Sequence, residues 1–526
     1  MKRILFTCLA LQLAALSVLR AQQEVVFPDD FGDDRLDGKE VTITNTLTLT
    51  NNYSAFRGGS VTLSDGLLRI PTELARPDRE MFEQQNALNA ANQLYLAATD
   101  DYDYIDSDGT CRIGQTVTGL TGTASYNAST GRYTIYPTRQ PALEGNRRPT
   151  APGAAEGSNL RVASFNLEWY DDEDAAQRAK IVAALCAMQA DVYALVEVCG
   201  NEAVEGLCRA LNEALGTDAF AHTLNNQGTN QMNYFVYNTA TVEPYKETQQ
   251  NRLALWNGNP YLPERKVAQG FTLRSNGERF VVCLNHWKAK DSDGDTGDGQ
   301  GGSAEKRRVE AEATLQFVGE MQAYYEDEDV LVVGDLNAYS QEDPVRILEE
   351  GGLANQLQKY APEGYSYAYY DNGYYGVGYL DHSLATPSLD GQICSARPFH
   401  INADEPDGLR LGQSHVQEGN MYACSDHNPI VTDINLGGTG TGIGGTLAAA
   451  SASGLTARLA GGTLTVACSK EMERIEVFDL GGRQVYEGEV AGCTSSLYVG
   501  QLAGGSYVVT VRTVDGGRLT AKCVAR

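Results

Sequence analysis

The stretch over residues 330–339, VLVVGDLNAY, constrains the fold of this chain more than any other. Residues 330–333 are apolar and mostly β-branched, which predicts a strand buried on both faces. Gly334 ends the run and permits a tight turn. Asp335 and Asn337 then follow the carboxyl end of the strand, where open α/β proteins place their ligand sites. The motif alone is equally typical of an ordinary turn, so the prediction of a site depends on the stretches that accompany it.

The acidic composition of the chain limits its partners. Its 526 residues include 41 basic and 68 acidic side chains, a formal net charge of −27. Non-specific binding to nucleic acid needs Lys and Arg against the phosphates, so this balance argues against it. The balance suits an exported protein, or a site that recruits cations to meet a polyanion.

The first 21 residues are typical of a signal peptide. Lys2 and Arg3 precede an apolar run over residues 4–19, and Ala21 offers a small-residue cleavage point. The run is short for a membrane span, and no later stretch is long and apolar enough for one. We therefore expect the mature chain to be exported.

The cysteine count fits an oxidising compartment. The chain has 11 cysteines, and removal of Cys8 with the signal peptide leaves an even number. Cys199 with Cys208, and Cys394 with Cys424, are candidate disulfide pairs. The alternative is that they are buried free thiols.

Residues 24–140 carry an all-β pattern. KEVTITNTLTLTNNY alternates polar and apolar residues, and QTVTGLTGTASYN and GRYTIYPT repeat the alternation. The acidic run over residues 100–109 offers carboxylates for Ca²⁺, but a solvated acidic loop is the preferred interpretation. Residues 141–158 are rich in Pro, Gly and Ala and are predicted to be a linker.

Residues 159–436 change to an alternation of strands and helices. LRVASFNLEW predicts a strand that ends at Asn166, and ADVYALVEV predicts a buried strand that ends at Glu197. Between them, AAQRAKIVAALCAM has apolar residues at helical spacing. A hairpin around Asn276 and Gly277 and a further helix follow. We therefore predict an α/β domain.

Polar residues that suit phosphoester chemistry stand at the ends of these predicted strands. They are Asn166, Glu197, His286, Asp335, Asn337, Asp381, Asp426 and His427. Oxygen ligands in a carboxylate cluster suit a hard cation such as Mg²⁺ or Mn²⁺, and two histidines without a nearby cysteine do not indicate zinc. A metal neutralises phosphate charge, and a histidine oriented by a carboxylate moves protons near neutral pH.

Six stretches in a fixed order, SFNLEW, ALVEV, NHWKAK, GDLNAY, GYLDHSLA and SDHNPI, resemble the endonuclease/exonuclease/phosphatase family with its DNase I-like fold. The resemblance covers residues 160–436. It implies a four-layer α/β/β/α sandwich and a divalent metal. The β-rich region before it then resembles the OB-like barrel of many secreted bacterial nucleases, with a structural or interaction role preferred because it is short of basic residues.

The resemblance also implies a role for each matching residue. Glu197 would be the metal ligand, with Asn166 beside it contacting metal or phosphate, and Asp426 would belong to the metal end of the site.

The proton-handling residues follow from the same resemblance. Asp335 would align or activate the attacking water, and Asn337 would help to hold it. His427 would act on the phosphate or as general base, with Asp381 orienting it. His286 would be a second catalytic histidine, protonating the leaving oxygen or stabilising the phosphorane.

A finer resemblance points to an extracellular nuclease branch, through DGQG followed by an Arg and through GYLDH. Two positions depart from the family pattern: Val196 replaces a Gln, and Asn238, after Tyr237, replaces an Arg that would clamp phosphate. Tyr237 and Lys288 remain candidate substrate-binding residues, and Lys290 could also meet phosphate.

Three other features have plainer interpretations. Asp291, Asp293 and Asp295 are spaced as in a Ca²⁺ loop, but the next Gly and the closing Glu are missing, so a loop beside the site is preferred and Ca²⁺ stays open as a structural ion. His382 is expected to be structural. The tyrosines over residues 365–379 could stack on bases, but half or more are expected to pack the sheet.

The C-terminal region is predicted to be a third unit. Residues 437–454 form a Gly/Ala/Ser linker, and residues 455–526 have the short strands and Gly turns of a small β-sandwich. EVFDLGGRQVY, LAGGSYVVTV and AKCVAR resemble the C-terminal sorting domain of the type IX secretion system of Bacteroidetes. This implies recognition by that machinery, with release or surface attachment. A carbohydrate- or protein-binding module is the alternative.

These observations predict a secreted, metal-dependent phosphodiesterase, a nuclease that cuts DNA, with RNA left open. A phosphatase or phospholipase-type phosphodiesterase of the same fold, acting on lipid or sugar phosphates, is the enzyme alternative. A non-catalytic surface-binding protein is a third interpretation, and the complete set of polar residues argues against it.

Overall fold

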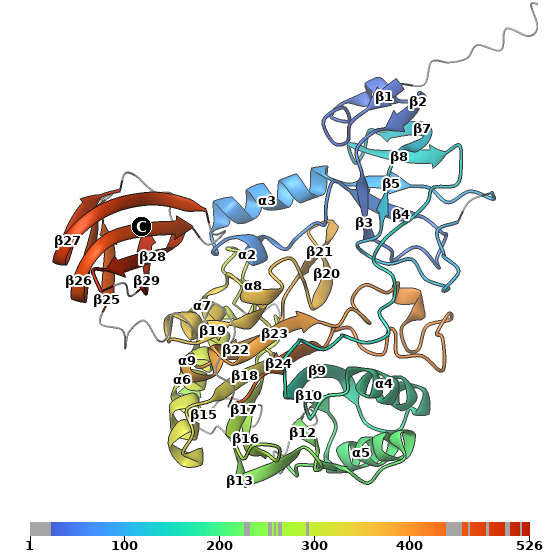
Figure 1. Ribbon diagram of the computed structural model, residues 1–526. Coiled ribbons are helices and arrows are strands. Elements are labelled where there is room, and N and C mark those ends of the chain that lie inside the picture. The colour runs from blue at the N-terminus through green and yellow to red at the C-terminus, as the bar shows by residue number, and fades with distance from the viewer. Residues whose placement is uncertain are drawn as a thin grey trace, which may run out of the picture. The chain divides into compact units, whose positions relative to one another are not determined.

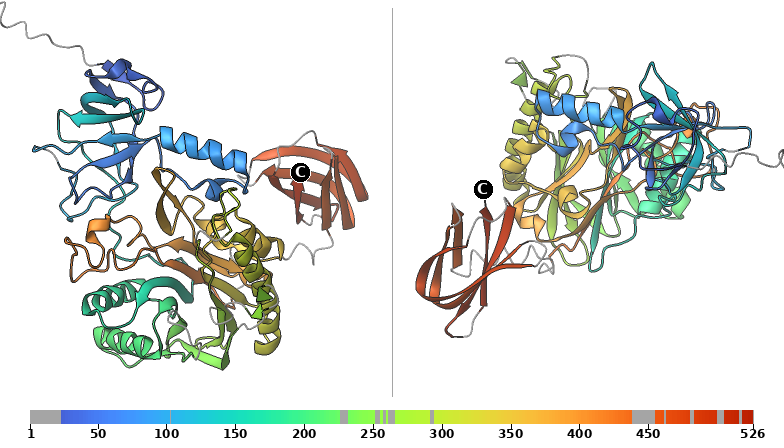
Figure 2. Two further views of the ribbon diagram at one scale, coloured as in Figure 1. Left: turned by 180° about the vertical axis from the view of Figure 1, so that it is seen from behind. Right: turned by 90° about the horizontal axis from the view of Figure 1, so that it is seen from above.

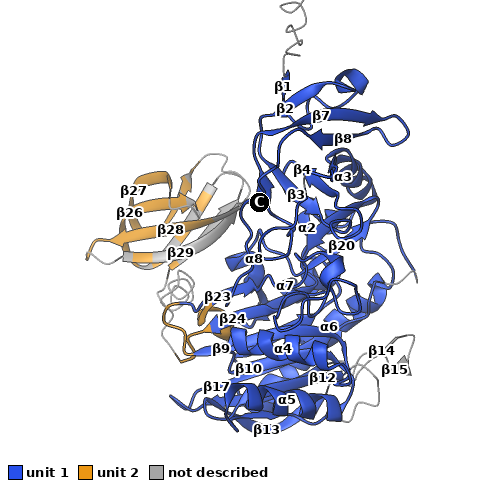
Figure 3. Cartoon of the chain, turned by 90° about the vertical axis from the view of Figure 1, so that its right-hand side faces the viewer, with its two compact units in different colours: residues 1–155, 160–386, 395–433 blue, residues 156–159, 387–394, 434–526 orange. Residues whose placement is uncertain are grey.

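The computed structural model describes residues 23–525, apart from 102, 226–231, 251–254, 257–258, 261–265, 291–293, 438–454, 461–462, 480–482, 500–504 and 516–517. The predicted signal peptide, most of the linker over residues 437–454, and Asp291 and Asp293 therefore lie outside the described residues. The chain divides into two compact units (Figure 3). The first contains residues 1–155, 160–386 and 395–433, and the second contains residues 156–159, 387–394 and 434–526.

Two six-stranded sheets form the centre of the α/β region (Figure 1). One has the order β11 (Phe220–His222), β12 (Met232–Asn238), β10 (Val192–Val198), β9 (Leu160–Tyr170), β24 (Ile430–Ile434), β23 (Ile393–Pro398). The other has the order β13 (Val242–Gln250), β16 (Lys266–Leu273), β17 (Arg279–His286), β18 (Val330–Asp335), β22 (Asp381–Ala385), β19 (Ala354–Asn355). Contacts of β9 and β10 with β18 show that the sheets pack against each other.

Helices cover the outer faces of both sheets (Figure 2). Helices α4 (Ala175–Met188) and α5 (Asn201–Leu215) share a buried apolar core with β9, β10 and β12. Helices α6 (Ala304–Tyr325) and α7 (Asp343–Glu350) share another core with β17 and β18. The side chain of Asp174 begins α4 by accepting hydrogen bonds from two backbone N–H groups of its first turn. This helix–sheet–sheet–helix order agrees with the four layers predicted for residues 159–436.

Strand β18 is the predicted central strand, and all six of its residues are buried. It runs parallel to β17 and antiparallel to β22. Gly334 has φ +125°, and a Cβ atom there would lie 1.9 Å from the carbonyl oxygen of Asn285. Only glycine therefore allows β17 and β18 to approach so closely just before Asp335.

The N-terminal region forms an eight-stranded sheet. Its order is β1 (Gln23–Val25), β2 (Glu40–Ile43), β7 (Leu120–Asn127), β8 (Arg132–Pro137), β5 (Leu94–Leu96), β4 (Val61–Ser64), β3 (Leu47–Asn51), β6 (Thr116–Val117). Within the described part of the chain, no pairing between β1 and β6 closes this sheet, so the OB-like barrel stays a prediction.

The prediction that residues 24–140 are all-β was wrong at one place. Helices α2 (Pro71–Leu74) and α3 (Arg79–Ala91) interrupt the strands. The Asp78 side chain caps α3 by accepting a hydrogen bond from the backbone N–H of Met81 at 2.9 Å. Helix α3 was missed because it is largely polar and lacks a wide apolar stripe.

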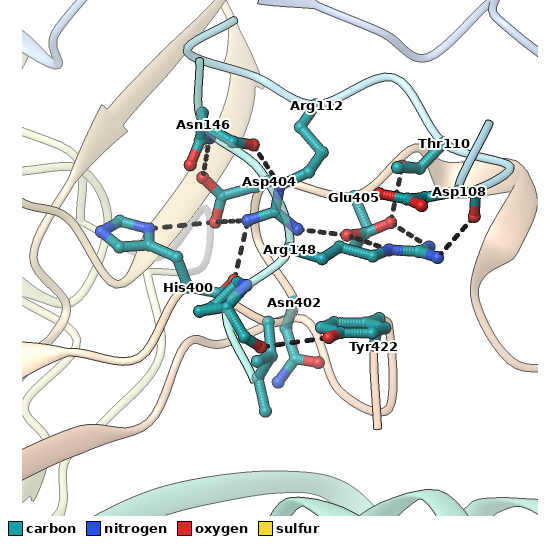
Figure 4. A network of polar contacts seen from close by, with 12 residues as sticks. Asp108, Thr110, Arg112, Asn146, Arg148, His400, Asn402, Asp404, Glu405 and Tyr422 are labelled. Carbon is teal, nitrogen blue, oxygen red and sulfur yellow. Dashed lines mark hydrogen bonds and ion pairs between the residues drawn. The ribbon is translucent and has the colours of Figure 1, made fainter. Parts of the chain in front are cut away.

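A buried network of ion pairs joins the N-terminal region to a loop of the α/β region (Figure 4). Arg112 is fully buried, pairs with Glu405 and donates to the carbonyl oxygen of His400 at 2.7 Å. Arg148 Nη2 lies 2.6 Å from the other oxygen of Glu405. Burial opposes ionisation of Asp404, but His400 and Arg112 outweigh it and hold the pKa of this carboxyl below its usual value. The two regions therefore belong to one compact unit.

The C-terminal region forms a five-stranded antiparallel sheet. Its strands are β25 (Leu455–Ala460), β26 (Thr463–Asp479), β27 (Gln484–Tyr498), β28 (Gly505–Thr513) and β29 (Arg518–Ala525). The structure shows the predicted strands, whereas a two-sheet sandwich stays a prediction. In the described residues, no helix is long and apolar enough to span a membrane.

The two proposed disulfides are not formed. Cys199, Cys208, Cys394 and Cys424 are all free thiols. Cys208 packs into the core beneath α5, and Cys424 Sγ lies 3.4 Å from Asn402 Oδ1. Burial raises the pKa of the Cys208 thiol to about 11 and that of Cys424 to about 12. The buried-thiol alternative therefore describes Cys208 and Cys424, because the tertiary structure directs them into the protein interior.

Candidate active site

Strands from both sheets bring the predicted residues to one place, although the prediction that the first strand ends at Asn166 was wrong, because β9 continues to Tyr170. In the first sheet, β9 and β10 run parallel and pair Asn166 with Val196, next to Glu197. In the second, His286 of β17 lies opposite Asp335 of β18, and Asp335 lies opposite Asp381 of β22. Asp426 and His427 lie in the loop just before β24.

Glu197, His286 and Asp335 form a cluster whose ligand atoms all lie within 4.8 Å of one another. His286 Nε2 is 3.5 Å from Glu197 Oε1 and 3.8 Å from Asp335 Oδ2. Asn166 Nδ2 donates to Asp335 Oδ2 at 3.1 Å and to Glu197 Oε1 at 3.3 Å. His286, predicted to be a catalytic histidine, thus also has the position of a metal ligand.

The electrostatics of this cluster fit a bound cation. Burial raises the pKa of Asp335 to about 7, and burial together with Asp426 raises the pKa of Glu197. Carboxylates crowded in a buried place resist ionisation unless a positive charge joins them. Carboxylate oxygens are the ligands that Mg²⁺ and Mn²⁺ prefer, so the residues present fit such an ion.

His427 and Asp381 form a tight pair beside the cluster. His427 Nδ1 donates to Asp381 Oδ2 at 2.6 Å, which leaves Nε2 3.9 Å from both Asp335 Oδ2 and Asp426 Oδ1. Burial opposes a charge on this imidazole, but Asp381, Asp426 and Asp335 outweigh it and hold the pKa of His427 well above its usual value. This hydrogen bond fixes the orientation of the His427 ring.

The turn after β18 holds Asp335 and Asn337 in place. Asn337 has φ +49°, and its backbone N–H donates to Asp335 Oδ1 at 2.9 Å. Its side-chain amide donates to the carbonyl oxygen of Trp287 at 3.1 Å. The turn therefore fixes the Asp335 carboxylate before any substrate arrives.

A cavity of about 710 Å³ opens over these groups. Six of the predicted residues line it together with Lys288: Glu197, His286, Asp335, Asn337, Asp426 and His427. Asn166 and Asp381 are buried and do not line the cavity. Asn166 donates a hydrogen bond to the lining residue Asp335, and Asp381 accepts one from the lining residue His427.

The structure contradicts one expectation about substrate binding, the one for Tyr237. Tyr237 pairs with Val192, at the end of β10 away from Glu197, and does not line the cavity. Lys290 lines the cavity, but its ammonium donates to both carboxylate oxygens of Glu342 at 2.6 and 2.7 Å. His382 is fully buried against the carbonyl oxygen of Ala338, as expected for a structural residue.

Sequence reasoning missed Arg410 and Glu168, which lie beside the site. Arg410 forms an ion pair with Glu168 and lies 4.0 Å from Asp426 Oδ2. Burial and then Asp426 raise the pKa of Glu168 to about 7. The Tyr367 ring lies 4.6 Å from the imidazole of His427. Glu168 could have been found from its place in SFNLEW, whereas Arg410 lies in a loop without a pattern.

Glu73 of α2 buttresses the turn that carries the site. It accepts hydrogen bonds from Ser340 Oγ at 2.7 Å and from the backbone N–H groups of Ser340 and Tyr379, each at 3.1 Å. Burial nevertheless dominates and raises the pKa of this carboxyl to about 7. The folded state therefore binds this proton more tightly than the unfolded chain does.

Glu73→Gln is expected to remove part of the pH dependence of stability. Because the folded-state pKa is the higher one, the contribution of Glu73 to stability falls as pH rises from about 4.5 to 7, by about 3 kcal/mol. The wild type should thus lose more thermal stability than Glu73→Gln between pH 5 and pH 8. Thermal melts at both values check this, with the exposed Glu80→Gln as control. Equal losses in wild type and Glu73→Gln would contradict the assignment.

Comparison with known proteins identifies the family. The family model described as the endonuclease/exonuclease/phosphatase family matches residues 163–427, half of the chain. The chain belongs to this family. Its members are hydrolases that act on phosphate esters and typically depend on a divalent metal. The match spans every strand-end residue from Asn166 to His427.

Three solved structures with similar folds belong to proteins with different names. An endonuclease/exonuclease/phosphatase family protein from Bacteroides thetaiotaomicron has 15% identity and a TM-score of 0.38, over 52% of this chain and 94% of that chain. A mannosyl-6-phosphatase from the same organism has 15% identity and a TM-score of 0.37, over 52% and 99%. A 3′ phosphatase from Neisseria bound to a product DNA hairpin has 16% identity and a TM-score of 0.36, over 52% and 99%. No curated protein matches the chain.

Proposed function

We propose that this chain is a metal-dependent phosphodiesterase that hydrolyses nucleic acid, with DNA as the principal substrate and RNA as a second. The observation that carries the proposal is the position of Asp335. Its Oδ2 atom lies 3.8 Å from His286 Nε2 and 3.9 Å from His427 Nε2. A candidate metal cluster and an oriented histidine therefore face one cavity, which is the combination that phosphoester cleavage needs.

The chain's own residues would divide the chemistry between them. Glu197 and Asp335, with His286 beside them, would hold a divalent cation, which neutralises phosphate charge and stabilises the leaving oxygen when bound. Asn166 orients both carboxylates through its amide. His427 Nε2 is the atom placed to exchange a proton, because Nδ1 is held by Asp381.

The proposal is tested by metal-dependent cleavage. Purified protein is incubated with supercoiled plasmid, a single-stranded oligonucleotide and bis(p-nitrophenyl) phosphate, in Mg²⁺ or Mn²⁺ and in EDTA. We expect hydrolysis that EDTA abolishes and added Mg²⁺ or Mn²⁺ restores. A folded protein that hydrolyses none of these diesters with any of Mg²⁺, Mn²⁺ or Ca²⁺ would overturn the proposal.

A second candidate function is hydrolysis of sugar or lipid phosphates. The scarcity of positive charge in the cavity favours this candidate. Among the described lining residues, only Lys288 and Lys290 carry an ammonium group, and the ammonium of Lys290 pairs with Glu342. A volume of about 710 Å³ also falls in the range of pockets for small ligands. A panel of phosphomonoesters distinguishes the two, because faster release of phosphate from sugar phosphates than cleavage of oligonucleotides would favour this candidate.

We also propose export of the enzyme, as an extracellular nuclease of a Bacteroidetes species. The support is the signal-peptide pattern of the first 21 residues and the resemblance of residues 455–526 to a type IX sorting domain. The mass of the extracellular form tests this proposal. A form lacking both segments is expected, and an intact tail on the secreted protein would argue for a retained binding module.

A further inference from the structure

The N-terminal region contributes one wall of the catalytic cavity. Ile70, Pro71 and Phe82 line it, although all three lie outside the segment 163–427 that the family match covers. Figure 1 shows α3, which carries Phe82, next to the hairpin of β20 (Tyr367–Asp371) and β21 (Tyr374–Gly378). Residues from that hairpin line the same cavity.

Specific contacts build this wall into the site. The backbone N–H of Ile70 donates to the carbonyl oxygen of Val377 at 3.1 Å, which adds the N-terminal segment to β21. The Tyr374 hydroxyl donates to Asn86 Oδ1 of α3 at 2.8 Å. Arg79 Nη2 donates to the carbonyl oxygen of Thr296 at 2.8 Å. The wall is therefore held from both the hairpin and the loop before α6.

Phe82 itself is held against that loop. Gly299 has φ +95°, and a Cβ atom there would lie 2.7 Å from Cδ2 of the Phe82 ring. The backbone of Gly299 thus packs directly on one side of the ring, while the ring also lines the cavity. This close packing limits the movement of Phe82.

Aromatic rings continue from the catalytic histidine toward solvent. The Tyr367 ring lies 4.6 Å from His427 and stacks on Tyr369 at 6.2 Å with an interplanar angle of 23°. Tyr369 and Trp169 both line the cavity and are 49% and 58% exposed. These exposures leave ring surface available to a ligand at the mouth of the cavity.

We propose that Phe82 and Tyr369 form a subsite for an unpaired nucleobase next to the reacting phosphate, so that the substrate is a single strand or an unpaired end. This proposal rests on the proposed function. Aromatic rings bind the flat faces of bases, which a single strand offers and a stacked duplex does not. A duplex-binding groove would instead need a series of Lys and Arg against phosphates.

The small number of positive side chains among the described lining residues of the cavity also favours a single-stranded substrate. Lys288 and Lys290 supply the ammonium groups of this lining, and Lys290 is held by Glu342. The chain as a whole carries a formal charge of −27. Affinity for nucleic acid is therefore expected to come more from stacking than from phosphate contacts.

The full-length protein with Mg²⁺ tests the subsite in steady-state kinetics on three matched DNAs. These are a single-stranded oligonucleotide, its duplex, and the same single strand with abasic spacers around the cleavage position. The wild type is expected to have its lowest KM on the ordinary single strand. Phe82→Ala and Tyr369→Ala are each expected to raise that KM on the order of tenfold with kcat unchanged, and to leave KM on the abasic strand unchanged.

The control is Leu88→Ala, which changes a residue on the same helix that is 63% exposed and does not line the cavity. It should behave as the wild type. A lower KM for duplex than for single strand, or an equal rise of KM on ordinary and abasic strands, would overturn the subsite. Preferential hydrolysis of sugar phosphates would overturn it too. Failure of the wild type to hydrolyse even bis(p-nitrophenyl) phosphate would instead contradict the proposed function.

Discussion

His427→Ala is expected to lower kcat for phosphodiester hydrolysis by about 10³-fold, with a small change in KM. The imidazole is placed by its hydrogen bond to Asp381, and its Nε2 atom is directed to the oxygens of Asp335 and Asp426. Alanine removes the group that moves a proton there and leaves Asp381 buried without its partner. Steady-state kinetics on a single-stranded oligonucleotide measure the loss.

Asp381→Asn separates catalysis from positioning. An amide in place of the carboxylate keeps the size of the side chain but no longer stabilises a charged imidazole, so kcat should fall and its pH dependence should shift to lower pH. The exposed His415→Ala, a histidine outside the cavity lining, is the matched control and should retain wild-type kcat. Wild-type kcat in His427→Ala, with the protein folded, would remove His427 from the mechanism.

Glu197→Gln is expected to weaken binding of a divalent cation by about 100-fold or more. Removal of a residue that only hydrogen-bonds to a metal ligand already lowers metal affinity about 10- to 100-fold, and Glu197 is proposed to be a ligand itself. Glu197 Oε1 lies 3.5 Å from His286 Nε2, and its other oxygen accepts the backbone N–H of Trp169 at 3.2 Å. Glutamine keeps the shape of the side chain but removes its charge. Calorimetric titration of EDTA-treated protein with Mn²⁺ measures the affinity without reference to activity.

The exposed Glu213→Gln of α5 is the control for this titration and should bind Mn²⁺ as the wild type does. Because Asn166 and His286 stay in place, the variant should keep its fold and its thermal stability in EDTA. Unchanged Mn²⁺ affinity in Glu197→Gln would mean that the cation, if bound, is held elsewhere.

The sequence was sufficient to predict the α/β class, a buried strand over residues 330–333, and a set of polar residues near the strand ends, although β18 itself continues to Asp335. This succeeded because each signal is local. A run of β-branched residues specifies a strand, and the residue after it must emerge at the sheet edge. Asn166, Glu197, His286 and Asp335 could thus be selected before their distances were known, and parallel pairing then brought them together.

Tertiary packing selects the residues from distant segments that complete the site. Phe82 and Glu73 come from a region of strands and polar helices, and Arg410 comes from a loop, so no periodicity marks them. Conversely, the sequence pattern made Tyr237 a candidate substrate-binding residue. The antiparallel pairing of β12 with β10 places Tyr237 opposite Val192, at the end of β10 away from Glu197. Contacts between residues far apart in the chain depend on how elements pack, and packing leaves little trace in local sequence patterns.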